Sequence, residues 1–310
     1  MRAILFPGQG SQVVGMGSEF YNNFPFVKEL FSKADDQLKF KISKIILEGP
    51  EEELKLTQNT QPAILLVSYS IFSVLKKEFN FDISKVKYFA GHSLGEYSAL
   101  LCANVISFED ALKLLFERGK SMQEAVPVGK GGMLAVLGSE INEIENLIKQ
   151  IKSQGICEIA NDNAPGQIIV SGNIEPINEF KIILKENKKK CIPLPVSAPF
   201  HCSLMNPSSD HMKKIIDKTN FLNSEFEIIT NVNANPTTKS EDFKKLLVEQ
   251  IYSKVRWRET IEFMNSKSVN EFIEIGPGKV LAGLVKRIKS DSKACSINSI
   301  DDIKSLDNES

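Results

Sequence analysis

The feature of this chain best suited to chemistry is a serine between two glycines. Gly91-His92-Ser93-Leu94-Gly95 fits the Gly-x-Ser-x-Gly pattern of a nucleophile elbow. A short apolar strand is expected at residues 86–90 and a helix at residues 94–103, so the motif lies at a strand-to-helix turn. Such a turn raises the serine hydroxyl above the sheet edge and places the next backbone N–H where it can stabilise an oxyanion. A tight turn with an unreactive serine is the alternative.

A nucleophilic serine needs a base, and the chain has only three histidines. His92 adjoins the serine, but neighbours around a tight turn usually point apart. His211 lies among lysines in an expected helix, which favours a surface position. His201 follows Ala198-Pro199-Phe200 in an irregular turn, where functional side chains are often placed. Elimination therefore favours His201 as the base, and a packed or exposed histidine without function is the alternative.

The elements that must position these residues have an α/β pattern. Apolar runs alternate with helical periodicity, which predicts a mainly parallel sheet with crossover helices. Ser107 is a candidate N-cap for a helix at 107–122, because Asp110 follows three residues later. The other expected elements of this large domain are strands at 2–6, 226–230 and 271–275, helices at 62–77, 241–252 and 280–288, and a frayed tail at 301–310.

The order of strand and helix patterns changes between Pro127 and Val196, which predicts a small inserted subdomain. Strand and helix patterns follow one another there as β-α-β-β-α-β, which is a ferredoxin-like order. We therefore divide the chain into a large α/β catalytic domain at 1–126 and 197–310 and a small subdomain at 127–196. The expected elements are strands at 133–137, 156–160, 167–171 and 191–194 and helices at 142–152 and 176–187.

Composition excludes several classes of protein. The chain has 310 residues, 42% of them apolar and 25% charged, with a formal net charge of −1. This balance argues against broad binding to nucleic acid. No apolar run is long enough for a membrane span, and residues 1–6 suit a first strand better than a signal peptide. The five cysteines are scattered without CxxC spacing, so we expect neither disulfides nor a metal site, and a reducing cytoplasm is the simplest location.

Six ordered motifs resemble those of the malonyl-CoA:acyl-carrier-protein transacylases. Their order and spacing are matched from residue 1 to about residue 290, which is nearly the whole chain. The length resembles that of the free-standing enzyme of type II fatty acid synthesis. The motifs are Phe6-Pro7-Gly8-Gln9-Gly10-Ser11-Gln12, Gly91-His92-Ser93-Leu94-Gly95-Glu96-Tyr97, Asn163-Ala164-Pro165-Gly166-Gln167, Ala198-Pro199-Phe200-His201, Val255-Arg256-Trp257 and Glu274-Ile275-Gly276-Pro277-Gly278.

The resemblance implies an α/β-hydrolase-like core with a ferredoxin-like subdomain, and it implies roles for several residues. Ser93 and His201 would form a catalytic dyad rather than a triad. The main-chain carbonyl of Gln250 would orient His201, without the rise in pKa that an aspartate would cause. Gln9 and the N–H of Leu94 would form the oxyanion hole. Gln9 could otherwise be a loop residue that closes a glycine turn.

The resemblance also implies three substrate-binding residues. Arg118 matches the arginine that binds the free malonyl carboxylate, for which a planar guanidinium is well suited. Considered alone, Arg118 could be a solvated residue near a helix end. Phe200 matches a bulky residue that would favour malonyl over methylmalonyl groups. Asn163 would shape the rim of the pocket, although a simple Asn-x-Pro-Gly turn explains it equally well.

The implied reaction is a ping-pong transfer of a malonyl group through a malonyl-serine ester. Malonyl-CoA is the donor, the phosphopantetheine thiol of acyl-carrier protein is the acceptor, and CoA is the product. No tightly bound cofactor or metal is expected, and the expected partners are acyl-carrier protein and malonyl-CoA, with a monomeric enzyme in the cytoplasm or in an organelle. Lysine-rich segments at 188–190 and 286–289 are candidate docking sites for an acidic carrier, although either could be an ordinary solvated surface.

Three alternatives remain open. The same motifs would serve a trans-acting acyltransferase of polyketide synthesis. A serine hydrolase or esterase could use the same elbow, although its histidine usually lies late in the chain, whereas about 100 residues follow His201 here. A non-catalytic module that binds the carrier is the third alternative, although all the expected reactive positions are filled.

Overall fold

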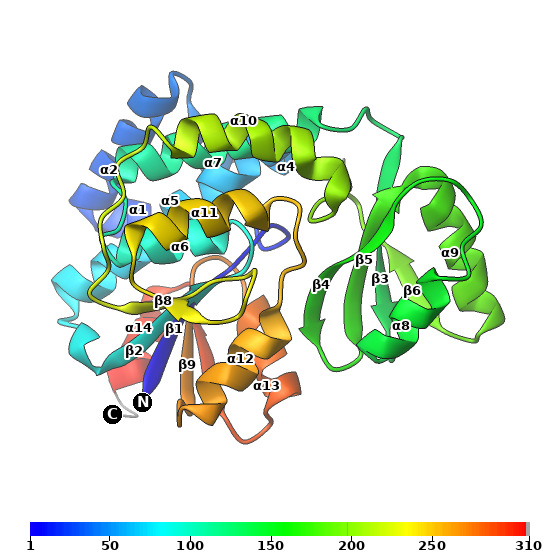
Figure 1. Ribbon diagram of the computed structural model, residues 1–310. Coiled ribbons are helices and arrows are strands. Elements are labelled where there is room, and N and C mark those ends of the chain that lie inside the picture. The colour runs from blue at the N-terminus through cyan, green and yellow to red at the C-terminus, as the bar shows by residue number, and fades with distance from the viewer. Residues whose placement is uncertain (197, 308–310) are drawn as a thin grey trace.

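The computed structural model describes residues 1–196 and 198–307. The predicted domain boundary at Ser197 and the end of the predicted frayed tail, residues 308–310, lie outside the described residues. The described chain forms a large domain and a small subdomain, which lie side by side (Figure 1). The predicted α/β class is confirmed.

The large domain is built on a six-stranded sheet in the order β10-β9-β1-β2-β7-β8. Every neighbouring pair is parallel except β7 and β8, which confirms the mainly parallel sheet. The central strand β1 pairs with both β2 and β9, so the elbow after β2 lies near the middle of the sheet. The strands are β1 (Arg2–Phe6), β2 (Val86–Gly91), β7 (Glu227–Ile229), β8 (Pro236–Thr237), β9 (Glu271–Ile275) and β10 (Lys293–Ile297).

Helices cover both faces of this sheet, and the side chains of β1 alternate between them. Ile4 and Phe6 join the larger core, with α5, α6 and α7, whereas Ala3 and Leu5 join the core beneath α12 and α13. The helices of this domain are α1 (Ser18–Asn23), α2 (Pro25–Leu38), α3 (Ile42–Glu48), α4 (Glu51–Lys55), α5 (Thr57–Glu78), α6 (Gly95–Cys102), α7 (Phe108–Glu124), α10 (Asn206–Ile216), α11 (Ser240–Gln250), α12 (Trp257–Ser266), α13 (Val280–Ile288) and α14 (Ile300–Asp307), with short 3₁₀ turns η1 (Ile83–Lys85) and η2 (Ser203–Met205).

The small subdomain is an antiparallel sheet in the order β4-β5-β3-β6, with two helices on its outer face (Figure 1). Chain order and strand order together are ferredoxin-like, as the sequence predicts. Strand β4 is the edge strand on the side of the large domain. The elements are β3 (Gly131–Leu137), α8 (Ile141–Ile148), β4 (Cys157–Ala164), β5 (Gln167–Asn173), α9 (Ile174–Glu186) and β6 (Lys190–Pro193), all within the expected range 127–196.

Two sequence-based expectations are wrong. Strand β4 continues to Ala164 instead of ending at Ala160, so Asn163 lies in a strand rather than in a turn. The reason is long-range pairing, because Ala160 and Asp162 exchange main-chain hydrogen bonds with Val255. The expected frayed tail is helix α14 as far as Asp307, since Ile303 is only 1% exposed and joins the large core.

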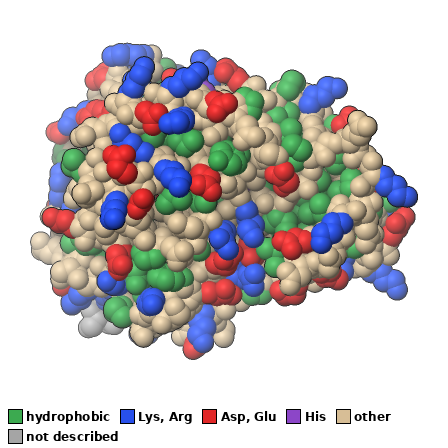
Figure 2. Space-filling model, in the orientation of Figure 1, with side chains coloured by type: hydrophobic (Ala, Val, Ile, Leu, Met, Phe, Trp, Pro, Cys, Tyr) green, Lys and Arg blue, Asp and Glu red, His purple; other side chains and the backbone are tan. Residues whose placement is uncertain are grey.

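The surface in Figure 2 carries Lys and Arg side chains interspersed with Asp and Glu. This face therefore has no uniform positive field. Among the helices that the structure describes, none has the length and apolar character needed to cross a bilayer.

Candidate active site

The nucleophile elbow is built by close contact between backbones. Strand β2 ends at Gly91, α6 begins at Gly95, and Ser93 between them has a φ of 55°. A Cβ atom on Gly91 would lie 1.9 Å from the carbonyl oxygen of Gly95, and a Cβ atom on Gly95 would lie 2.2 Å from the carbonyl oxygen of Phe6. Both positions therefore require glycine, and Ser93 is held in the left-handed region that few L-residues adopt.

Ser93 and His201 form a hydrogen-bonded pair. Ser93 Oγ lies 2.8 Å from His201 Nε2, and His201 Nδ1 lies 2.9 Å from the carbonyl oxygen of Gln250. Since a carbonyl oxygen can only accept, Nδ1 carries the ring proton and Nε2 is free to accept the proton of Ser93. The main-chain carbonyl thus fixes the tautomer that a general base requires.

The surroundings of His201 favour the neutral imidazole. Its side chain is 5% exposed, and burial lowers the pKa of His201 to about 3, with a further lowering by the positive charge of Arg118. The hydrogen bond to Gln250 opposes this shift only in part. His201 is therefore unprotonated, and able to accept a proton, across the neutral pH range.

Arg118 extends from α7 to the same serine. Its Nη2 donates to Ser93 Oγ at 3.1 Å and to Gln250 Oε1 at 2.9 Å, and its Nη1 donates to Gln61 Oε1 at 2.7 Å. The side chain is 1% exposed, and no carboxylate in the described part of the chain forms an ion pair with it. A buried guanidinium held only by neutral groups at the nucleophile is suited to receive an anionic group of a substrate.

The side chain of Gln250 joins Arg118 to the base of the elbow. Its Nε2 donates to the carbonyl oxygen of Ser93 at 3.0 Å and to Glu96 Oε2 at 2.8 Å. Asn231 completes this network, since its Oδ1 accepts the N–H of Ser93 at 2.7 Å and its own N–H donates to Glu96 Oε2 at 2.9 Å. Burial raises the pKa of Glu96 to about 7, against these hydrogen bonds and the nearby charge of Arg118. Both main-chain polar groups of Ser93 are thus fixed by side chains.

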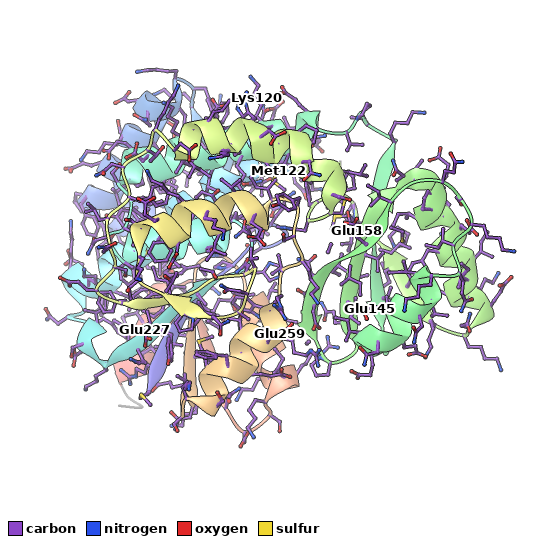
Figure 3. All side chains as sticks on the ribbon, in the orientation of Figure 1. Lys120, Met122, Glu145, Glu158, Glu227 and Glu259 are labelled. Carbon is purple, nitrogen blue, oxygen red and sulfur yellow. The ribbon has the colours of Figure 1, made fainter. Side chains whose placement is uncertain are left out.

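These residues open into a cavity of about 450 Å³. Its wall is formed by both parts of the molecule, since Met122, labelled in Figure 3, belongs to α7 and Met133 belongs to β3. A space of this size accommodates an extended small-molecule chain. The lining residues are Gln9, Gly10, Gln12, Lys55, Gln61, His92, Ser93, Leu94, Arg118, Met122, Met133, Asn161, Leu194, Pro195, Val196, Phe200 and His201.

The structure brings most of the predicted site residues together. Gln9, Leu94 and Phe200 line the cavity beside the Ser93–His201 pair, and Gln9 Nε2 also lies 3.5 Å from Thr57 Oγ1. Asn163 is not among the residues described as lining the cavity. Its Oδ1 instead lies 2.8 Å from His92 Nε2.

The other two histidines are placed away from Ser93 Oγ. His92 is directed by its ring nitrogen towards Asn163, as the geometry of a tight turn suggests. His211 is exposed on α10 and pairs with Glu117 at 3.3 Å, which confirms its expected surface position.

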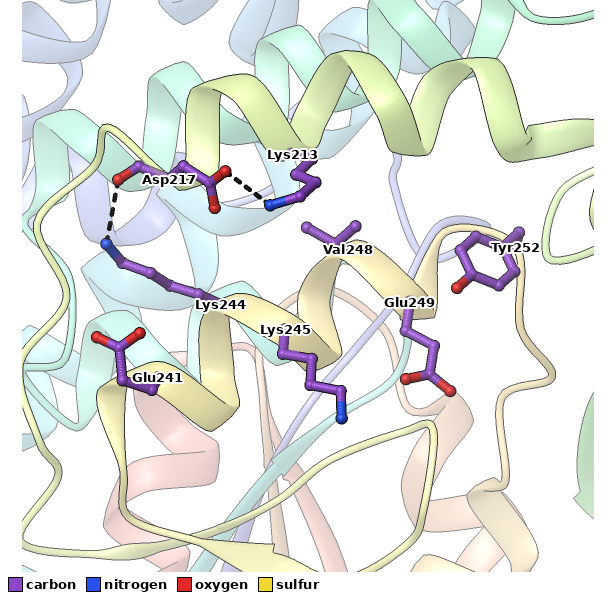
Figure 4. A pocket seen from close by; sticks show the side chains of 8 residues that line it. All are labelled: Lys213, Asp217, Glu241, Lys244, Lys245, Val248, Glu249 and Tyr252. Atoms are coloured by element: carbon purple, nitrogen blue, oxygen red, sulfur yellow. Dashed lines mark hydrogen bonds and ion pairs between the residues drawn. The ribbon is translucent and has the colours of Figure 1, made fainter.

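A second depression of about 350 Å³ lies between α10 and α11 (Figure 4). It is lined by side chains of both charges, and its Lys213 and Lys244 contact the side chain and the carbonyl oxygen of Asp217. No serine, cysteine or histidine is among its described lining residues, so it offers neither a serine or thiol nucleophile nor an imidazole base. The described residues contain no group of three His, Cys, Asp or Glu side chains arranged to hold a metal ion.

Sequence reasoning did not find Gln61, Asn161 or Asn231, and it assigned no role to Glu96. Gln61 offered no local signal, since it ends the polar run at residues 57–61, just before the apolar stretch expected as a helix at 62–77. Asn231 lies two residues after the end of β7, and the loop after a strand is a frequent position for functional residues. Its pairing with the elbow depends on contacts across 138 residues of sequence, which no local pattern reveals.

The sequence of this chain matches a known protein family over almost its whole length. The model of the acyl transferase domain family matches residues 4–304, and the chain belongs to this family. A curated relative from Bacillus subtilis, named malonyl CoA-acyl carrier protein transacylase, is 43% identical and is aligned over 96% of this chain and 93% of its own.

Solved structures agree with this assignment. An acyl-carrier-protein-S-malonyltransferase from Bartonella henselae is 40% identical, with a TM-score of 0.96 over 99% of this chain and 98% of its own. A type II PKS acyl-carrier protein in complex with its malonyl-transacylase gives a TM-score of 0.96 at 38% identity, over 100% of this chain and 99% of the matched chain. The hydrolase-like core with a ferredoxin-like subdomain is therefore confirmed.

Proposed function

We propose that this chain transfers the malonyl group of malonyl-CoA to the phosphopantetheine thiol of acyl-carrier protein and thereby supplies fatty acid synthesis. The observation that carries the proposal is the environment of Ser93 Oγ, which contacts a general base, His201 Nε2, and a buried cation, Arg118 Nη2, at once. Membership of the acyl transferase family and relatives named malonyl CoA-acyl carrier protein transacylase support it.

The first half of the reaction acylates the enzyme. His201 Nε2 accepts the proton of Ser93 as Oγ attacks the thioester carbonyl carbon of malonyl-CoA. The N–H of Leu94, at the start of α6, and the amide of Gln9 stabilise the resulting oxyanion. When the carbon–sulfur bond breaks, the CoA thiolate takes the proton from His201 and leaves. A malonyl-Ser93 ester remains.

The second half regenerates the serine. The pantetheine thiol of the carrier enters the cavity, and His201 accepts its proton. The thiolate attacks the ester carbonyl, and Ser93 Oγ leaves as it takes that proton back from His201. Donor and product are both thioesters, so the free-energy change of the overall exchange is close to zero. The reaction therefore requires no nucleotide hydrolysis and no redox group. We therefore propose that no tightly bound cofactor takes part.

Three residues would select the acyl group. The guanidinium of Arg118 would exchange its contact with Ser93 Oγ for the free carboxylate of the malonyl group. Phe200, 7% exposed in the cavity wall, would crowd a branch at the 2-position and favour malonyl over methylmalonyl. Asn163 would act on the pocket through His92, to which it is bound, rather than by touching the substrate.

We further propose a monomer that acts in the cytoplasm, with acyl-carrier protein as its macromolecular partner. None of the five cysteines, all of which the structure describes, forms a disulfide, which suits a reducing compartment. The solved complex of a related malonyl-transacylase with its acyl-carrier protein supports the choice of partner. Size-exclusion chromatography with light scattering tests the monomer, for which a mass near 34.6 kDa is expected.

The decisive experiment is the intact mass of the protein after mixing with malonyl-CoA in the absence of carrier. We expect an increase of one malonyl group, no increase in Ser93→Ala, and loss of the increment when phosphopantetheinylated carrier is added. Release of free malonate without an adduct would favour the hydrolase instead. If neither adduct nor malonate formed, the protein would be a carrier-binding module without catalysis.

A further inference from the structure

One strand of the small subdomain, β4, contacts all three segments of the large domain that hold the Ser93–His201 pair. Glu158 contacts the segment after His201, residues 160–162 pair with Val255 beyond Gln250, and Asn163 contacts His92 in the elbow. Successive positions along a single edge strand therefore contact residues one to five positions away in sequence from the nucleophile, the base and the group that orients the base.

The contact at Glu158 has the best-defined geometry. Its Oε1 accepts from Ser203 Oγ at 2.6 Å, and its Oε2 accepts from the N–H of Ser203 at 2.8 Å. Ser203 begins the 3₁₀ turn η2, only two residues after His201. Figure 3 places Glu158 between the small sheet and the segment that leads into α10. Glu158 thus fixes both a main-chain and a side-chain group close to the base.

The conformation of His201 explains why it needs such a restraint. His201 has a φ of 57°, which is unfavourable for a side chain with a Cβ atom. The described residues between β6 and η2, 194–196 and 198–202, have no regular secondary structure of their own, so the conformation around His201 depends on contacts with neighbouring parts. Glu158 supplies two of these contacts from the small subdomain, and Cys202 Sγ adds one to the carbonyl oxygen of Pro199 at 3.2 Å.

We propose that Glu158 is a positioning residue for His201, which it holds through Ser203, and that β4 thereby couples the small subdomain to the catalytic dyad. This proposal rests on the proposed acyl transfer. A shift of about 1 Å in the base is enough to slow proton transfer severely. The small subdomain then does more than enclose the cavity, because it holds the base within reach of the nucleophile.

Two substitutions of Glu158 separate positioning from charge. Glu158→Ala removes both contacts with Ser203 and should lower the rate of Ser93 acylation by about 10- to 100-fold. Glu158→Gln keeps both contacts, because its amide oxygen can accept from the Ser203 N–H and its NH₂ group can donate to Ser203 Oγ. Glu158→Gln should therefore restore most of the rate.

Glu179 provides a matched control within the same subdomain. Its carboxylate also holds a serine, since Oε2 accepts from the Ser153 N–H at 2.8 Å and from the Ser153 hydroxyl while Oε1 accepts from the Lys152 N–H, but Glu179 lies on α9 and contacts no residue of the cavity wall. Glu179→Ala removes an equivalent acid–serine contact. It should leave the acylation rate at the wild-type value, even if it lowers the thermal midpoint as much as Glu158→Ala does.

The measurements are pre-steady-state acylation by malonyl-CoA, the KM for malonyl-CoA, and the pH profile of acylation. We expect Glu158→Ala to slow acylation with little change in KM. Hydration of the loosened segment should also raise the pKa of His201 towards its ordinary value and produce an acidic limb near pH 6. The charged or titratable groups that act electrostatically on His201 are Arg118 on α7 and His92 at the elbow, and neither variant changes them.

The outcomes distinguish this inference from the proposed function. The proposal is overturned if Glu158→Ala acylates at the wild-type rate, if Glu179→Ala is slowed equally, or if Glu158→Gln gives no rescue. If the wild type forms no malonyl adduct, the proposed function fails instead. The same variants can then be compared by the rate at which a fluorophosphonate labels Ser93, which needs the dyad but not malonyl-CoA.

Discussion

At the scale of single residues, Arg118 is the clearest test of acyl selectivity. Its guanidinium is buried and bound only to neutral oxygens of Gln61, Ser93 and Gln250, so a substrate carboxylate would be its first anionic partner within hydrogen-bond distance. Arg118→Ala should lower kcat/KM for malonyl transfer about 100-fold, the size of a lost charge-assisted contact of about 3 kcal/mol. Acetyl transfer should be spared or improved.

Arg118→Lys is the control, because it keeps the charge but loses the planar fork that binds both carboxylate oxygens. We expect a malonyl rate between those of the wild type and Arg118→Ala. Steady-state kinetics with malonyl-CoA and acetyl-CoA measure both variants. An equal loss for both donors in Arg118→Ala would show that Arg118 supports the site generally and does not select the acid.

The pKa of His201 leads to a prediction about pH. With a pKa of about 3, His201 remains neutral as the pH falls, so the rate of Ser93 acylation should stay level from pH 8 to pH 5. An unperturbed histidine would lose half its base form near pH 6.5. Stopped-flow acylation across this range measures the effect, and Glu96→Gln is the control, because Glu96 itself titrates near pH 7. An acidic limb near pH 6.5 that persists in Glu96→Gln would contradict the prediction.

The lowered pKa of His201 also makes the free energy of unfolding depend on pH. Between pH 6.5 and about 3 the unfolded chain binds a proton at His201 that the folded chain does not. The contribution of His201 to the free energy of unfolding therefore decreases as the pH falls through this window. It is constant above pH 6.5.

At the scale of elements, the elbow depends on two glycines that no other residue can replace. A Cβ atom in Gly91→Ala would meet backbone atoms of Gly95 at 1.9 Å, where no side chain can move aside. We expect a loss of about 3 kcal/mol in the free energy of unfolding, together with loss of acylation. Urea denaturation measures the first quantity.

Gly283→Ala is the matched control in helix α13. Gly283 is exposed, and a Cβ atom there would meet nothing within 4 Å outside its neighbours and its own helix. This substitution should stabilise the protein by about 0.5–1 kcal/mol, because alanine is the better helix former. A similar effect of both substitutions would mean that the elbow is more adaptable than its contacts indicate.

Some helices and strands can be predicted from the sequence because local patterns determine them, whereas others depend on distant contacts. The strand–turn–helix around Ser93, the N-cap contact of Ser107 with Asp110 at 3.0 Å and the ferredoxin-like order all follow from short-range patterns. The extension of β4 to Ala164 and the helix at the end of the chain do not, because each is stabilised by residues distant in sequence. For the same reason, the sequence left Asn163 open between the pocket rim and a simple turn, whereas it is found in strand β4.

At the scale of the whole molecule, the site is formed between two bodies. Residues of the large domain supply the nucleophile, the base and the cation, while Met133, Asn161 and the segment 194–196 close the cavity from the other side. Sequence motifs identified the reactive groups because each motif is local. The network of Glu96, Gln250 and Asn231 beneath them could not be predicted, since it joins segments more than 130 residues apart.

The docking of an acidic carrier can be tested on this molecule by charge reversal. Lys286, Arg287 and Lys289 already contact Ser292, Gln167 and Asp291. In the other segment Lys189 pairs with Glu143, but Lys188 and Lys190 are exposed at the start of β6 and form no ion pair within the described part of the chain, and the residues that follow β6 line the cavity. The segment 188–190 is therefore the better candidate for the docking site.

Lys188→Glu combined with Lys190→Glu should raise the KM for carrier about 10-fold, leave the KM for malonyl-CoA unchanged, and have less effect at high salt. Lys33→Glu combined with Lys44→Glu is the control, because these exposed lysines lie on α2 and α3, are not among the residues that line the cavity, and give the same change in net charge. Kinetics with varied carrier at two salt concentrations measure the effect. An equal rise in KM for both pairs would mean that the carrier responds to net charge, whereas no rise for the first pair would place the docking surface elsewhere.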